Sequence, residues 1–110
     1  MRRDEFEQKA AVKVTPVTIG ADVYHIKSMT AGERVAFEER SLKDGEVIAE
    51  EFYPELLART LCDEDGTRWY ADDEAGRFKS MAAGLIHRLA EAAMAANALG
   101  TKAMEEARGN

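Results

Sequence analysis

An apolar stripe in the last third of the chain constrains the fold more than any other feature. Its members recur every three or four residues, at Phe78, Met81, Leu85, Leu89, Ala92, Ala96 and Leu99. This spacing follows the roughly 3.6-residue turn of an α-helix and predicts one long amphipathic helix over Asp73–Leu99. Asp72 suits the N-cap of that helix, and Gly100 suits the position after its end. Such a helix needs other elements to cover its apolar face.

Length and composition indicate a single globular domain. The chain has 110 residues, of which 45% are hydrophobic and 33% charged, and a chain of this size buries roughly two thirds of its unfolded surface. Cys62 is the single cysteine, so no intrachain disulfide is expected and a reducing cytoplasm fits. No apolar run reaches the ~20 residues that a membrane span needs, and no signal-peptide pattern precedes the domain.

The negative charge is concentrated in the middle of the chain. Residues 31–75 carry five Lys/Arg against fourteen Asp/Glu, a net charge of −9, whereas the whole chain carries −6. Such a segment repels nucleic acid phosphates, so no nucleic acid partner is expected. It forms either an ordinary solvated acidic surface or a surface that steers a basic partner.

The N-terminal part predicts a loose segment over residues 1–11 and a β-hairpin over residues 12–27. Apolar and polar residues alternate from Val12 to Ile19, Gly20-Ala21-Asp22 is a turn signal, and Val23–Ile26 resembles a returning strand. Pro16 lacks an N–H and therefore favours an edge position or a bulge. Because an isolated hairpin is marginally stable in water, this one must pack on helices or pair with another chain.

A helical core over residues 30–99 follows the hairpin. Thr30-Ala31-Gly32-Glu33 matches a capping box and predicts a helix from Ala31 to about Lys43, ended by Asp44-Gly45. Its inner face is expected to carry Val35 and Leu42, with Phe37 to the side. The fold class is therefore α+β and mainly helical: a hairpin followed by about three helices, with residues 100–110 as a tail or short helix.

A second helix is expected from Glu46 to Leu61, since Ile48, Phe52 and Leu56 recur every four residues. Pro54 predicts a kink or a restart within it. Asp63–Gly66 should form a turn, because Gly66 readily adopts positive φ. Thr67–Tyr70 favours a short strand.

The sequence provides no catalytic grouping, metal site or cofactor motif. Cys62 stands beside acids that oppose thiolate formation, which favours a buried core residue. His25 and His87 are far apart in sequence and show no zinc-ligand spacing. An EF-hand reading of the acidic turn fails, because no register places Asp first and Gly sixth. We therefore expect a protein that is not an enzyme.

Two features suggest partner binding. Trp69 and Tyr70 could anchor a partner, or they could form an aromatic lid on the core. The small side chains around Ala92 and Ala96 would allow close approach of a second helix, either from a partner or from the same chain. Self-association is a further expectation from this stretch.

The order of these segments resembles the tail assembly chaperones of long-tailed bacteriophages. The matching pieces are a hairpin at Val17–Ile26, the helix start Thr30–Glu33, a second helix at Ile48–Leu61, the acidic-Gly-aromatic segment Leu61–Tyr70, and a long helix at Asp73–Asn97. The resemblance covers about residues 15–100, and the proline at position 54 departs from the pattern.

The resemblance implies a non-enzymatic protein of the host bacterial cytoplasm that is absent from the mature virion. It would bind and solubilise the long helical tape measure protein and help tail tube protein polymerise around it. Two other classes stay open: a small self-associating tail or head-completion subunit, and an acidic regulatory adaptor such as an antitoxin-like protein. Presence in finished particles would favour the structural subunit. A neighbouring toxin gene would favour the regulatory adaptor.

Overall fold

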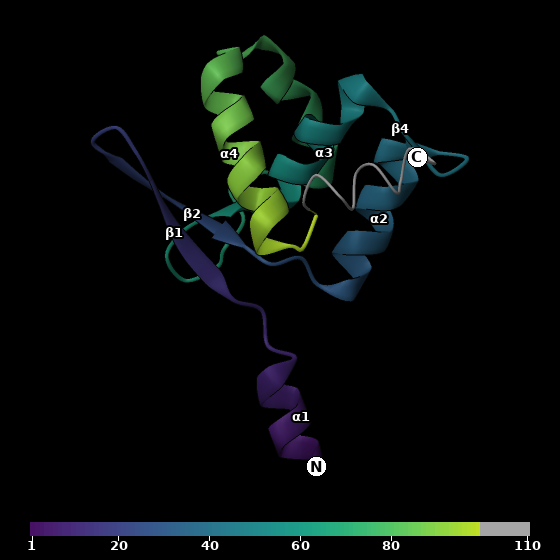
Figure 1. Cartoon of the computed structure of the whole chain (residues 1–110), viewed down its shortest axis with the longest axis vertical. Helices are drawn as coiled ribbons and strands as arrows, with labels where there is room; N and C mark the ends of the chain where they lie inside the picture. Colours follow the sequence, from purple (N-terminus) through teal and green to yellow (C-terminus); the bar gives the residue numbers. More distant parts are fainter. Residues whose placement is uncertain (100–110) are drawn as a thin grey trace.

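Short strands and helices alternate along the chain in a computed structural model that describes residues 1–99. The elements are α1 (Arg3–Lys9), β1 (Val14–Ile19), β2 (Asp22–Lys27), α2 (Ala31–Ser41), β3 (Leu42–Lys43), β4 (Glu46–Val47), α3 (Ala49–Thr60), β5 (Leu61–Cys62), the 3-10 helix η1 (Asp72–Ser80) and α4 (Ala83–Ala96). Helices α2, α3 and α4 gather beside the hairpin, as Figure 1 shows. This confirms the expected α+β, mainly helical class. The predicted tail at 100–110 lies outside the described residues.

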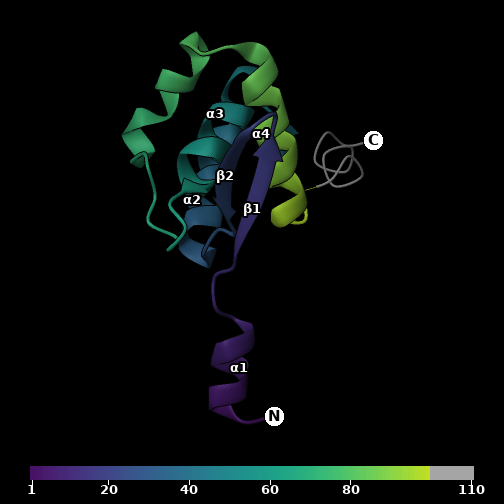
Figure 2. The same ribbon diagram turned by 90° about the vertical axis from the view of Figure 1, so that its left-hand side faces the viewer.

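The hairpin becomes part of a three-stranded sheet of order β1-β2-β5. Strand β5 directly follows α3 and pairs antiparallel with β2, with Ile26 opposite Leu61. Helix α4 also lies against both hairpin strands (Figure 2). The expected packing of the hairpin on helices is thus present, and β5 ties it to the end of α3.

Pro16 lies on the outer edge strand, opposite His25. The Ser28 N–H donates to the Lys13 carbonyl, at 2.8 Å, so every second residue from Lys13 bonds to β2. Pro16 falls between the bonded positions, and its missing N–H therefore lies on the free edge. No ladder hydrogen bond is lost, which is why proline is tolerated there.

Helix α2 begins with the predicted capping box. The Glu33 N–H donates to Thr30 Oγ1 at 3.1 Å, and the Thr30 N–H donates to Glu33 Oε1 at 2.9 Å. The expected inner face was wrong, because Val35 is 58% exposed whereas Phe37 is buried. Phe37 packs edge-on against Phe52, with ring centroids 5.2 Å apart. Val35 is two residues away, about 200° around the helix, and so points outward.

Helices α2 and α3 are both shorter than predicted. Leu42–Lys43 leaves α2 to pair with Glu46–Val47 across a tight turn, in which Asp44 and Gly45 both have positive φ. This two-residue hairpin takes up residues assigned to both helices, because Asp-Gly at a left-handed turn favours such pairing.

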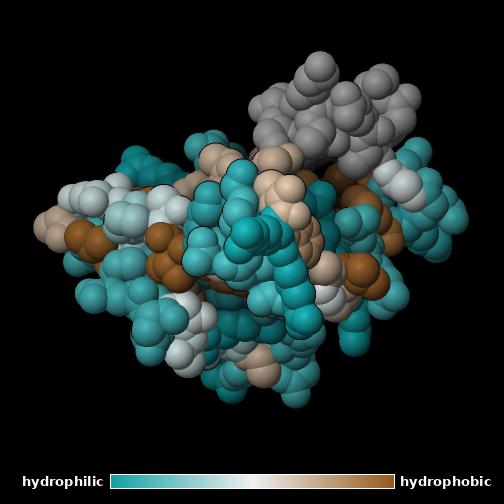
Figure 3. All heavy atoms as spheres, turned by 90° about the horizontal axis from the view of Figure 1, so that it is seen from below, coloured by the Kyte–Doolittle hydropathy of each residue, from teal (hydrophilic) through white to brown (hydrophobic). Residues whose placement is uncertain are grey.

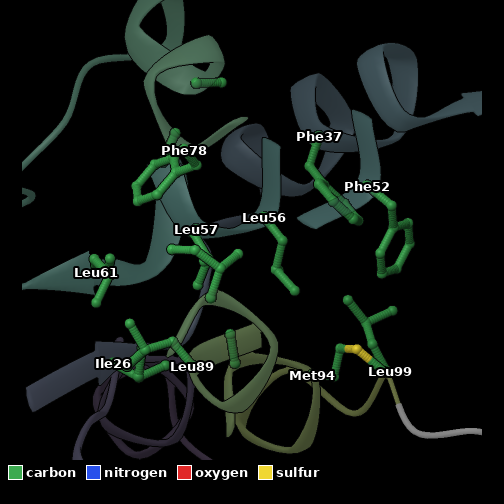
Figure 4. Close-up of a cluster of buried hydrophobic side chains, with 14 residues drawn as sticks. Ile26, Phe37, Phe52, Leu56, Leu57, Leu61, Phe78, Leu89, Met94 and Leu99 are labelled. Atoms are coloured by element: carbon green, nitrogen blue, oxygen red, sulfur yellow. The ribbon is translucent and has the colours of Figure 1, made fainter. Parts of the chain in front are cut away.

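Helix α3 is the centre of the fold and continues through Pro54, so that of the predicted kink or restart the restart is absent. Proline removes a single N–H there, near the helix start, and packing of the following turns compensates. The side chains buried along α3 come from nearly every face: Phe52, Pro54, Glu55, Leu56, Leu57, Ala58, Arg59 and Thr60. Figure 4 shows Leu56 and Leu57 between the aromatic residues of the other helices and the residues of α4.

The predicted single helix over Asp73–Leu99 was wrong, because two helices occupy this stretch. Met81 and Ala82 are extended, with ψ of 166° and 121°, and they separate η1 from α4. The break lets both pieces pack on α3, with Phe78 and Leu89 buried. Because η1 and α4 pack on α3 in different directions, one straight helix could not make both contacts. Tertiary packing therefore overrides the continuous apolar pattern of the sequence.

Asn97 caps α4 and joins its end to the N-terminal half of the chain. The Met29 N–H donates to Asn97 Oδ1 at 2.7 Å, and Asn97 Nδ2 donates to the Ala93 and Lys27 carbonyls at 2.9 and 3.4 Å. Arg34 Nη1 donates to the Asn97 carbonyl at 3.4 Å. One side chain thereby holds the exit of β2 against the end of α4.

The N-terminal segment, expected to be loose, instead forms helix α1. This helix buries none of its residues and stands apart from the rest of the domain (Figures 1 and 2). Asp4 and Glu5 in its first turn and Lys9 in its last turn suit the helix dipole, which helps explain why a helix forms here.

Candidate interaction surfaces

A connected row of six charged side chains, here called the charge chain, joins β2, α2, α3, η1 and the loop that precedes η1. Its members alternate in sign: Lys27, Glu33, Arg68, Asp72, Arg59 and Glu55. Lys27 binds Glu33, Arg68 Nη1 lies 3.2 Å from Glu33 Oε2, and Arg68 Nη2 lies 2.6 Å from Asp72 Oδ1. Arg59 completes it, with its Nη2 3.2 Å from Asp72 Oδ2 and its Nη1 3.1 Å from Glu55 Oε1.

The charge chain is a structural element rather than a reactive centre, since each acid faces at least one base. Arg59 is 1% exposed and Lys27 5%, and both are compensated by carboxylates. Arg68 Nε also donates to the Ala58 carbonyl at 3.0 Å. Arg59 Nε alone, among buried side-chain nitrogens and oxygens of residues 1–99, has no hydrogen-bond partner. Some acidic residues from the middle of the sequence therefore neutralise buried basic side chains.

Acid should weaken this charge chain. Burial would raise the pKa of Glu33, but hydrogen bonds from Lys27 and Thr30 and the charges of Lys27 and Arg68 lower it overall. The Arg68 hydrogen bond likewise lowers the pKa of Asp72, with Arg59 adding to the effect against burial. Groups with depressed pKa values stabilise the fold above their unfolded pKa and lose that contribution as pH falls through the folded pKa.

The ordinary pKa is 4.5 for a Glu and 3.8 for an Asp. We therefore expect the urea midpoint of the protein to fall as the pH drops below these values. Glu33→Gln should lose less stability between pH 6 and pH 3 than the unmodified protein. Glu38→Gln is the matched control, because Glu38 also pairs with an arginine but lies exposed. Equal pH slopes for all three proteins would contradict the assignment.

The acidic turn uses its carboxylates within its own loop. Gly66 has a φ of +88°, as predicted for this turn. Asp65 accepts the Thr67 N–H at 3.0 Å, and Trp69 Nε1 donates to Asp63 Oδ1 at 2.6 Å. Within residues 1–99 no group of three or more His, Cys, Asp or Glu is placed to hold a metal ion.

Cys62 is fully buried in the sheet, as the core interpretation predicted. Burial, opposed by Lys27 and reinforced by Asp63 and Asp65, raises the pKa of its thiol. The thiol lies 3.6 Å from the His25 carbonyl and donates to it. The expected short strand at Thr67–Tyr70 is reduced to a single bridge between Cys62 and Arg68, because the residues that follow turn away into η1.

The four predicted partner-binding residues lie on two separate segments. Trp69 is 48% exposed, whereas Tyr70 is half-buried and packs edge-on against Phe78, with ring centroids 4.7 Å apart. Ala92 and Ala96 are half-buried on α4 and contact the core. Tyr70 and the two alanines therefore serve intrachain packing, and Trp69 keeps an exposed side.

An apolar groove of about 450 Å³ opens between the starts of α3 and α4 and the end of η1. Apolar side chains form most of it, among them the buried Phe78 and Ile86. Its other lining residues are Ala49, Glu50, Tyr53, Pro54, Lys79, Met81, Ala83 and His87. The sequence did not reveal this groove, because it depends on the break at Met81–Ala82 that the continuous apolar stripe conceals.

Charges of both signs border the groove. Lys79 Nζ lies 2.5 Å from Glu51 Oε1, and this hydrogen bond raises the pKa of Lys79. His87 packs edge-on against Tyr53, with ring centroids 5.8 Å apart, and its Nε2 lies 2.6 Å from Glu91 Oε1. An apolar floor with a charged border can receive the apolar side of an amphipathic helix.

No protein-family model, curated protein or solved structure matches this chain. Among the helices of residues 1–99, none combines the length and the apolar character needed to cross a membrane.

Proposed function

We propose that this protein is a non-enzymatic tail assembly chaperone of a long-tailed bacteriophage. It binds the tape measure protein, keeps it soluble in the host cytoplasm and promotes assembly of tail tube protein. The open apolar groove between α3 and α4 carries this proposal, because it offers a binding place for a helical client. The hairpin, the capped helix and the acidic turn follow in the order of the family resemblance, whereas its single long helix at Asp73–Asn97 is divided here into η1 and α4.

The properties of the groove suit a helical client. An amphipathic helix presents apolar side chains at i, i+3, i+4 and i+7, which could contact Tyr53, Pro54 and Ile86 on the groove wall. Glu50, Lys79 and His87 would meet the polar sides of the same helix. A net charge of −6 keeps such a complex soluble and steers basic clients toward it.

Co-expression tests the proposal. The tape measure gene of the same genome should give more soluble product together with this chain than alone. Met81→Asp should reduce this gain, because it places a charge in the groove at a side chain that is already 39% exposed. Val35→Asp is the matched control, since Val35 is exposed on α2 and outside the groove. No gain in soluble tape measure protein would contradict the proposal.

Analysis of purified particles separates chaperoning from a structural role. A chaperone leaves the assembly, so mass spectrometry of finished tails should not detect this chain. Recovery in fixed stoichiometry with tail tube protein would favour a structural subunit.

A further inference from the structure

The apolar groove has two walls, each made from one face of a helix. Three residues of each helix, spaced by three and four positions, share the face that lines the groove: Glu50, Tyr53 and Pro54 on α3, and Ala83, Ile86 and His87 on α4. Four residue steps rise by about 6 Å, so each wall extends over about one helical turn. The polar side chains that flank a client's inserted turn therefore lie against the border of the groove.

The face at the α1 end of the molecule suits an apolar client less well. Figure 3 views the molecule from that end and shows a largely hydrophilic surface, on which the hydrophobic patches are separate from one another. The starts of α3 and α4, which form the groove, lie at the other end of the molecule in Figure 1. A helix that buries an apolar stripe is therefore better accommodated by the groove than by the face in Figure 3.

The border of the groove carries an excess of acid once its ion pairs are counted. Lys79 and His87 do not offer free positive charge, because Lys79 already bonds to Glu51 and His87 to Glu91. Glu50 is exposed in the first turn of α3 and forms no ion pair with any other residue of the described range 1–99. With the histidine neutral at pH 7, three carboxylates face one lysine, which leaves a net charge of −2.

The pKa of Lys79 reflects the same excess of negative charge. Its hydrogen bond with Glu51 raises this pKa most, and the charges of Glu51, Glu50 and Glu55 raise it further, against the opposing effect of burial. A second cation, brought to the border by a client, would meet the carboxylates of Glu50 and Glu51 in the same way. Arg88 follows the groove residues along α4 but does not line the groove.

We propose that the groove selects amphipathic helices whose apolar stripe is bordered by lysine or arginine, and that Glu50 is the main residue that determines this preference. This inference rests on the proposed function, because it names the class of client helix that the same groove receives. One turn of the client places its apolar side chains against Tyr53, Pro54 and Ile86. A lysine or arginine beside that turn pairs with Glu50, whereas an acidic residue in the same place is repelled.

Two synthetic peptides test this selection by fluorescence anisotropy with the full chain. They are labelled amphipathic helices of equal length with the same apolar stripe, and their flanking positions carry lysine in one and glutamate in the other. The lysine peptide should bind about tenfold more tightly at low salt, because its charge complements the border. The preference should shrink as salt rises, since exposed charges are screened. Equal affinities for the two peptides at low salt would overturn the proposal.

Variants of Glu50 assign the preference to the border. Glu50→Gln should weaken binding of the lysine peptide about threefold, because it removes an exposed ion pair, and Glu50→Lys about tenfold, because it adds repulsion. Glu39→Lys is the matched control, since Glu39 is exposed on α2 outside the groove and the net charge changes equally. If Glu39→Lys weakens binding as much as Glu50→Lys, the net charge of the chain causes the preference and the proposal is wrong. Urea midpoints check that each variant folds.

Met81→Gln separates failure of this inference from failure of the proposed function. It removes an apolar side chain from the groove at a position that is 39% exposed and adds no charge, so it should weaken both peptides equally. If it does so while the two peptides bind equally well, the groove receives helices without selecting their charge, and only this inference fails. If neither peptide binds the unmodified protein, the groove is not a site for helices, and the proposed function loses its support as well.

Discussion

Glu33→Ala should lower the free energy of unfolding by about 3–5 kcal/mol at pH 7, because it leaves buried charge without a partner. Glu33 binds both Lys27, whose side chain is 7% exposed, and Arg68, whose side chain is 23% exposed. The substitution also removes the acceptor that caps the Thr30 N–H. Urea denaturation followed by circular dichroism measures the loss.

A second substitution separates the two roles of Glu33. Glu33→Gln keeps a capping acceptor, because Glu and Gln both serve at this position, and removes only the charge. It should therefore cost less than Glu33→Ala but more than Glu38→Ala, which breaks an exposed pair worth about 1 kcal/mol or less. If Glu33→Ala and Glu38→Ala have the same unfolding free energy, the charge chain does not stabilise the fold.

Leu89→Ala should cost about 2–5 kcal/mol, as truncation of a buried leucine does. Leu89 is 3% exposed and lies in the core between α3 and the hairpin. Leu85→Ala makes the same chemical change four residues earlier on α4, where the side chain is only half-buried. Its cost should be clearly smaller, although the apolar stripe alone predicts the same burial for both. Equal losses, or an unchanged midpoint for Leu89→Ala, would contradict the packing of α4.

Features that depend on neighbouring residues were predictable from the sequence. The capping box at Thr30 and Glu33, the positive φ of Gly66 and the edge position of Pro16 each follow from the chemistry of a few adjacent residues. The burial of Leu89 followed from its place in the apolar stripe, and that of Cys62 from the neighbouring acids, which disfavour a reactive thiolate. Such features do not require knowledge of the rest of the chain.

Features that depend on distant segments were not predictable. The break at Met81–Ala82 exists because η1 and α4 pack on α3 in different directions, and the groove exists because of that break. Arg59 is buried because Asp72 approaches it from another segment, which no local rule reveals. The prediction for the inner face of α2 was wrong because Phe52 of α3 packs against Phe37 and not against Val35.

Asn97 affects how the domain assembles during synthesis. It fixes residues that precede it by 68 and 70 positions, so almost the whole domain must leave the ribosome before these bonds form. The hairpin emerges early but is marginal alone; its partner strand β5 follows only at Leu61–Cys62, and α4, which packs on both hairpin strands, comes later still. Closing such long loops slows folding. The contact of the hairpin with α4 therefore forms on the nascent chain only when translation of the domain is nearly complete.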